Sequence, residues 1–124
     1  MSNPPVLLNV VRLVRGQTKV LRITVKERTG APANLAGATI YFTARETPTS
    51  EVLICKTNGD GVTIDDPANG IATITLNSED TEIERGSYLY DVWVEYGGDP
   101  PIRHPVVKSA ELCVEERLGA FGCP

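Results

Sequence analysis

The single histidine of the chain, His104, is the residue on which most hydrolytic chemistry would depend. Any Ser-His-Asp or Cys-His arrangement must use it as the base. It stands in a proline-rich segment between Pro101 and Pro105, and no G-x-S-x-G motif occurs in the sequence. Such a segment positions a base poorly. We therefore interpret His104 as a surface residue, without a catalytic role.

Carboxylates are concentrated in one polar connection. Paired carboxylates are the catalytic groups of glycosidases, in which the distance between them sets the mechanism. The carboxylates of this connection are Glu79, Asp80, Glu82 and Glu84. No second segment faces them in the sequence pattern to fix such a distance, so we expect a solvated loop.

A second group of oxygen ligands lies close together in the chain, at Asn58, Asp60, Asp65 and Asp66. Calcium takes six to eight oxygens, and its commonest loop has a D-x-D-x-D-G pattern with a glutamate at the twelfth position. The spacing here does not match that loop. Asn-Gly and Asp-Gly are also the sequences that tight hairpin turns require. We predict turns, and no calcium site.

One histidine and widely spaced cysteines do not form a zinc site. The cysteines are Cys55, Cys113 and Cys123. The sequence therefore predicts no catalytic residues, no metal ligands and no cofactor, and we expect that the protein is not an enzyme.

The elements that would position any site are β-strands. Residues 86–96 alternate strictly: Tyr88, Tyr90, Val92, Val94 and Tyr96 fall on one face, and Leu89, Asp91, Trp93 and Glu95 on the other. Alternation of this length predicts a strand that is buried on one side. Tyr88 follows a turn in the manner of the tyrosine corner of immunoglobulin-like sandwiches. We expect its hydroxyl to bond to the backbone of residues 77–85.

Further strands are predicted at residues 6–14, 18–26, 38–46, 51–56, 62–64, 71–76 and 105–115. Turn signals separate them every 8–12 residues, and no helical period exceeds one turn. This pattern indicates an all-β, immunoglobulin-like antiparallel β-sandwich of seven to eight strands. We assign residues 1–116 to a single domain and residues 117–124 to a short C-terminal tail.

Composition fits a globular domain. The chain of 124 residues has 41% hydrophobic and 23% charged residues and no apolar run of the length that a membrane span needs. Its first five residues lack a secretory signal pattern, so we expect the cytoplasm or a particle assembled there. The strands that an immunoglobulin-type disulfide would join carry no cysteine. We expect free thiols, with Cys123 the only exposed one.

The net charge of −4 is unevenly distributed, because residues 1–30 carry six basic residues and one acidic residue. Nucleic-acid binding by a basic region also needs aromatic residues for base stacking, and this region has none. We therefore expect neither nucleic acid nor membrane as a partner. We expect a basic edge that meets an acidic neighbour.

Apolar residues and two arginines are candidates for a protein interface. Trp93 is predicted to point away from the core, and an outward tryptophan is a common interface anchor, although the chain's own loops or tail would also cover it. The strand at 6–14 is apolar on both faces, and a neighbouring subunit could bury one of them. The interface candidates are Leu7, Val11, Arg12, Leu13, Arg15 and Trp93.

Several segments, in order, resemble one family. They are residues 14–18 (VRGQT), 35–40 (LAGATI), 66–72 (DPANGIA), 80–81 (DT) and 86–91 (GSYLYD). The series resembles the immunoglobulin-like domains of tailed-phage and prophage structural proteins, and is similar to the N-terminal module of the phage baseplate upper protein. The resemblance covers about residues 10–115. It implies a structural or adaptor module of a virion, without catalysis.

In the baseplate protein this module precedes a long fibre region, whereas the present sequence ends soon after its last strand. We therefore expect an accessory subunit, either a capsid decoration protein or a tail or baseplate component. Its partners would be other virion proteins and further copies of itself, in a virion assembled in the host cytoplasm. The alternative is a ligand- or carbohydrate-binding immunoglobulin-like module on a phage or cell surface. That module would need an exposed aromatic cluster of Trp93, Tyr41 and Tyr96.

Overall fold

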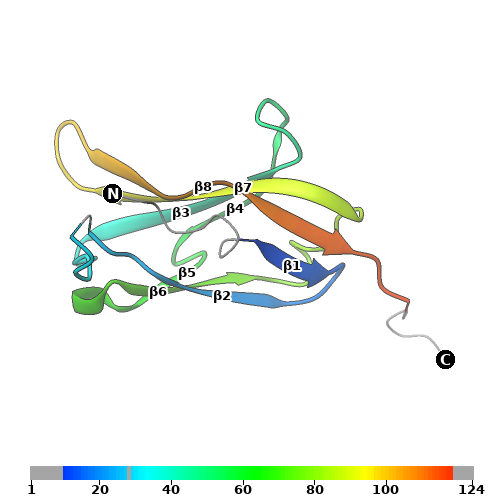
Figure 1. Cartoon of the computed structure of the whole chain (residues 1–124), viewed down its shortest axis with the longest axis horizontal. Helices are drawn as coiled ribbons and strands as arrows, with labels where there is room; N and C mark the ends of the chain where they lie inside the picture. The colour runs from blue at the N-terminus through cyan, green and yellow to red at the C-terminus, as the bar shows by residue number, and fades with distance from the viewer. Residues whose placement is uncertain (1–9, 28, 119–124) are drawn as a thin grey trace.

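The computed structural model describes residues 10–27 and 29–118, which form eight strands and one short 3-10 helix (Figure 1). In chain order these are β1 (Val11–Val14), β2 (Lys19–Thr24), β3 (Ala38–Arg45), β4 (Val52–Asn58), β5 (Gly61–Asp66), η2 (Pro67–Asn69), β6 (Ile71–Leu76), β7 (Gly86–Tyr96) and β8 (Ile102–Glu115). The bounds of β6 and β7 match the sequence prediction. Within the described residues, no helix is long and apolar enough to cross a membrane.

The strands form two layers that are joined in one continuous order, β1-β8-β7-β3-β4-β5-β6-β2 (Figure 1). β4 connects the layers, because its first part pairs antiparallel with β3 and residues 57–58 pair parallel with β5. The predicted all-β, immunoglobulin-like sandwich is confirmed. Most pairs are antiparallel, while β1 pairs with β8, and β4 with β5, in parallel.

The core follows the predicted alternation. On β7, Tyr88, Tyr90, Val92 and Val94 are all buried. The ring of Tyr90 stacks on that of Phe42 from β3, with the ring centroids 5.4 Å apart. Aromatic pairs in this arrangement add stability beyond their buried area. The stacked pair therefore contributes to the hydrophobic core.

Tyr88 forms the predicted tyrosine corner. Its side chain is buried, and its hydroxyl donates a hydrogen bond to the backbone carbonyl oxygen of Glu84, in the connection that leads into β7. The bond satisfies a polar group that would otherwise be costly to bury. It also ties Glu84, near the end of the connection formed by residues 77–85, to the start of β7.

We expect the free energy of unfolding to fall as pH rises from 10 to 12. Burial raises the pKa of Tyr90 from its ordinary value of 10.0 to about 12. Between these values the unfolded chain has lost the phenolic proton and the folded protein has kept it, so the unfolded state is favoured. Below pH 10 both states hold the proton, and the full stability is present. Urea unfolding at several pH values measures the slope. In the Tyr90→Phe variant the free energy of unfolding should fall less steeply with pH. An equal slope would show that Tyr90 is not the cause of the pH dependence.

The expectation for the thiols needs one correction. Cys55 and Cys113 are free, and Cys55 is exposed on β4. It is exposed because Ile54 and Lys56 take the inward positions on either side of it. Cys123 lies outside the described residues. The expectation that Cys123 is the only exposed thiol is therefore wrong, because Cys55 is exposed.

Candidate interaction surface

Ring side chains form a row across the outer face of the layer that contains β8, β7 and β3. Val92 and Val94 are buried, so strand alternation turns Trp93 to the outer face, where it is half-buried. Trp93 pairs with Tyr41 of β3 on one side and with Pro105 of β8 on the other. Residues directly opposite each other in an antiparallel sheet point to the same face. We call Pro105, Trp93 and Tyr41 the ring row.

A chain of polar contacts borders the ring row. The Tyr41 hydroxyl donates to Glu95 Oε1 at 3.0 Å, and Arg103 Nε donates to Glu95 Oε2 at 2.6 Å. The hydrogen bond from Arg103, helped by that from Tyr41, lowers the pKa of Glu95. The hydrogen bond to Glu95 raises the pKa of Tyr41. These contacts hold the phenol of Tyr41 in one orientation beside the indole.

The remaining interface candidates do not join Trp93 in one patch. Leu7 lies outside the described residues. Val11 and Leu13 are 8% and 3% exposed and belong to the domain's own core, so their side chains are not on the surface. Arg12 is exposed and is level with Ser87 of β7, which is about 20 Å along the strand from Trp93.

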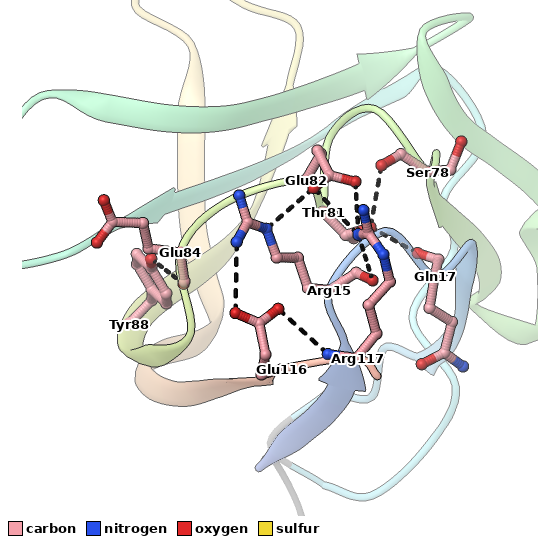
Figure 2. A network of polar contacts seen from close by, with 9 residues as sticks. All are labelled: Arg15, Gln17, Ser78, Thr81, Glu82, Glu84, Tyr88, Glu116 and Arg117. Carbon is pink, nitrogen blue, oxygen red and sulfur yellow. Dashed lines mark hydrogen bonds and ion pairs between the residues drawn. The ribbon is translucent and has the colours of Figure 1, made fainter. Parts of the chain in front are cut away.

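Arg15 takes part in a network of charges at one end of the sandwich (Figure 2). Its Nε lies 2.9 Å from Glu82 Oε2, in an ion pair whose N–H is not aligned for a hydrogen bond. Its Nη1 lies 3.5 Å from Glu116 Oε2, and Arg117 Nη1 lies 2.8 Å from Glu82 Oε1. Partly exposed pairs of this kind contribute about 0–1 kcal/mol each. Arg15 therefore contacts other parts of its own domain, and so does Arg117 of the expected tail.

Thr81 lies at the centre of the same end and is fully buried (Figure 2). Its hydroxyl donates to the carbonyl oxygen of Gln17 at 2.7 Å and lies 3.2 Å from that of Ser78. Its own carbonyl oxygen accepts from the N–H of Gly16. Thr81 thus joins the turn after β1 to the connection after β6.

Two of the four clustered carboxylates, Asp80 and Glu82, form ion pairs with cations. Asp80 contacts Lys56 and Glu82 contacts the two arginines, while Glu79 and Glu84 are exposed. In residues 10–27 and 29–118 no group of three or more His, Cys, Asp or Glu side chains is placed to hold a metal ion.

The second group of oxygen ligands is used in hydrogen bonds within the sheet. The Asn58 side chain accepts from the N–H of Ile40 and donates to the carbonyl oxygen of Ala38. Asp65 accepts from Thr73, and Asp66 accepts from Asn69. Asn58, Asp65 and Asp66 therefore lie in the last residues of β4 and β5, so the predicted turns are shorter than expected.

His104 is exposed on β8, and its ring meets the edge of Tyr96 at a centroid distance of 6.5 Å. Tyr96 is on the core-facing side of β7 and packs against the core. It therefore does not lie beside Trp93 and Tyr41, and the predicted cluster of three aromatic residues is reduced to two.

Sequence reasoning missed the contacts of Lys56 and of Glu95 with its partners. The inward position of Lys56 could have been predicted, because it lies two residues after Ile54 and therefore on the same face of the strand. The Tyr41–Glu95–Arg103 chain depends on the register between three strands, which a single sequence does not provide.

Comparisons with known proteins add little. No family model and no curated protein matches the sequence. Among solved structures, the chain is similar to AggA, the major subunit of aggregative adherence fimbriae type I from Escherichia coli, with 11% identity, a TM-score of 0.35, and 85% of this chain and 89% of that chain covered. A likeness of this degree carries no argument about function.

Proposed function

We propose that this protein is a non-enzymatic structural subunit of a tailed-phage virion, an accessory or adaptor module that acts through protein–protein contacts. Its location would be the virion, as a capsid decoration protein or a tail or baseplate component. Its partners would be other virion proteins and further copies of itself.

Hydrogen bonds join the segments that carry the family resemblance, and these contacts are in keeping with the proposal. Gly16 and Gln17 of the first segment bond to Thr81 of the fourth. The backbone N–H of Leu35, in the second segment, donates to the carbonyl oxygen of Pro67, in the third. Segments that are far apart in the sequence therefore contact each other in pairs.

The ring row is the observation that carries the proposed mode of action. Trp93 and Tyr41 present large, half-buried aromatic surfaces on a rigid sheet, and Glu95 and Arg103 supply a polar margin. A central aromatic group with a polar rim is the usual composition of a protein interface. We place the contact with the neighbouring subunit here.

A carbohydrate-binding module is the second candidate. Trp93 and Tyr41 side by side favour it, because aromatic faces bind apolar faces of ligands and polar groups beside them give specificity. The position of Tyr96 on the other side of β7 weighs against it. An array of glycans tests this candidate. Saturable sugar binding that is lost in Trp93→Ala would replace the structural proposal.

Trp93→Ala should reduce the number of copies on purified particles at least ten-fold. Truncating an interface hot spot costs about 2 kcal/mol or more, and each 1.4 kcal/mol is a factor of about ten. Quantitative mass spectrometry of particles measures occupancy. Leu53→Ala is a matched control, because Leu53 is an exposed apolar side chain, 42% exposed, on β4. Equal loss in both variants, or absence of the protein from particles, would contradict the proposal.

Charge reversal distinguishes an arginine on the surface from an arginine that stabilises the fold. Arg12→Glu should leave the isolated domain folded, since Arg12 is exposed, and a loss of incorporation in this variant would extend the contact beyond the ring row. Arg15→Glu is a poor test, because it would place a third carboxylate beside Glu82 and Glu116. The thermal midpoint of each isolated variant distinguishes the two effects.

A further inference from the structure

A groove of about 510 Å³ lies along the open side of the sandwich, between β2 and β8. β2 is the last strand in the sheet order and pairs with β6 alone among the described strands. Only residues 112–115 of β8 pair with β1. The two strands therefore border the groove with backbone groups that no described strand satisfies. Such edges readily accept a further strand.

The floor of this groove, which we call the β2–β8 groove, is apolar. Leu21 and Ile23 of β2 and Val106 of β8 line it and pack against the core, yet all three are only half-buried. These side chains face inward and lack cover on one side. Burying them would be favourable, because the gain scales with the apolar area removed from water.

The chain itself leads into the groove. Val10 and Val11 line it, and residues 5–9 (PVLLN) immediately precede them in the sequence. Five extended residues span about 17 Å, close to the length of about 20 Å expected for the six residues of β2. A segment tethered at the mouth of its own site has an effective concentration in the millimolar range.

Charge favours this segment over a second copy of β2. Arg12, Lys19 and Arg22 also line the groove. A second copy that paired its own β2 edge here would bring Lys19 and Arg22 against like charges, which opposes association. Residues 5–9 carry no charge, and three of the five are apolar.

We propose that residues 5–9 of the same chain bind the β2–β8 groove as an added edge strand on β2. Apolar side chains of residues 6–8 then complete the domain's own core. Leu7 would serve the fold and not a contact with a neighbouring subunit. The proposal does not depend on the virion function, and either can fail alone.

Amide hydrogen exchange of the full chain, followed residue by residue by NMR, tests the proposal. The amides of β2 that do not bond to β6 should exchange at least ten-fold more slowly than in Leu7→Asp or in Leu8→Asp. Two variants are needed because neighbouring residues of a strand point to opposite faces, so at least one introduces a carboxylate into the groove. Ser2→Asp is the control for added charge. Slow exchange in β7 verifies that each variant is folded.

Three results would overturn the proposal. The first is fast exchange of those β2 amides in the unaltered chain. The second is slow exchange that survives both substitutions. The third is protection that disappears on dilution and accompanies a dimer in sedimentation, which would assign the groove to the segment of a second copy.

Discussion

Asp80→Ala is expected to lower the free energy of unfolding by about 3 kcal/mol. The side chain of Lys56 is 7% exposed, and its ammonium group lies 2.8 Å from Asp80 Oδ2. The same carboxylate oxygen accepts a hydrogen bond from the backbone N–H of Asn77. Removing one member of a buried ion pair leaves the other charge without compensation, at a cost of about 3–5 kcal/mol. Urea unfolding measures the change.

Two comparisons isolate the buried charge as the cause. Glu79→Ala removes the adjacent carboxylate, which is exposed, and should change stability by less than about 0.5 kcal/mol. The double variant Lys56→Met/Asp80→Asn removes both charges and should recover a large part of the loss, because the uncompensated ammonium group is gone. A loss of less than about 1 kcal/mol in Asp80→Ala would show that Lys56 is solvated.

Gly70→Ala should destabilise the domain by about 2–4 kcal/mol, through strain and overpacking together. Gly70 follows η2 with φ of +70°, a conformation that residues with a Cβ adopt at a cost of about 1–2 kcal/mol. A Cβ would also lie 2.4 Å from the carbonyl oxygen of Val25 and 2.9 Å from that of Ala33. Both oxygens are backbone atoms, so relieving the contact requires the chain to move.

Gly37→Ala is the matched control for Gly70→Ala. Gly37 has φ of +74°, and a Cβ there would meet nothing within 4 Å. It should therefore show the conformational cost alone, about 1–2 kcal/mol. The difference between the two free energies of unfolding measures the steric contact. Equal losses would mean that the turn at Gly70 relaxes without cost.

The sequence predicted the bounds of a strand well where an alternating pattern and a turn residue beside it were both present. β7 combines strict alternation with a glycine at its start, and β6 lies between two turns, so their bounds could be read directly. β8 extends three residues further toward its start than expected, through Ile102, Arg103 and His104. The prolines at 100 and 101 suggested a longer loop, but pairing with β7 continues up to Ile102.

The candidate site was harder to predict, because it depends on which strands are neighbours. The outward position of Trp93 follows from alternation, while its alignment with Tyr41 and Pro105 requires the register of three strands. In the first strand, Val11 and Leu13 are buried in the domain's own core. The same apolar residues would be expected if a neighbouring subunit covered them. A sequence pattern reports that a face is buried, and not what buries it.

The parallel pairing of β1 with β8 has a mechanical consequence. The chain enters β1 at Val11, level with Leu112, and leaves β8 at Glu115, level with Val14. Tension applied before β1 and after β8 therefore pulls the two strands past each other along their axes. The hydrogen bonds between them are loaded simultaneously in shear, instead of opening one after another as in a hairpin that is pulled apart at its open end. The domain should resist stretching in that direction better than in any direction that peels a single strand from an edge.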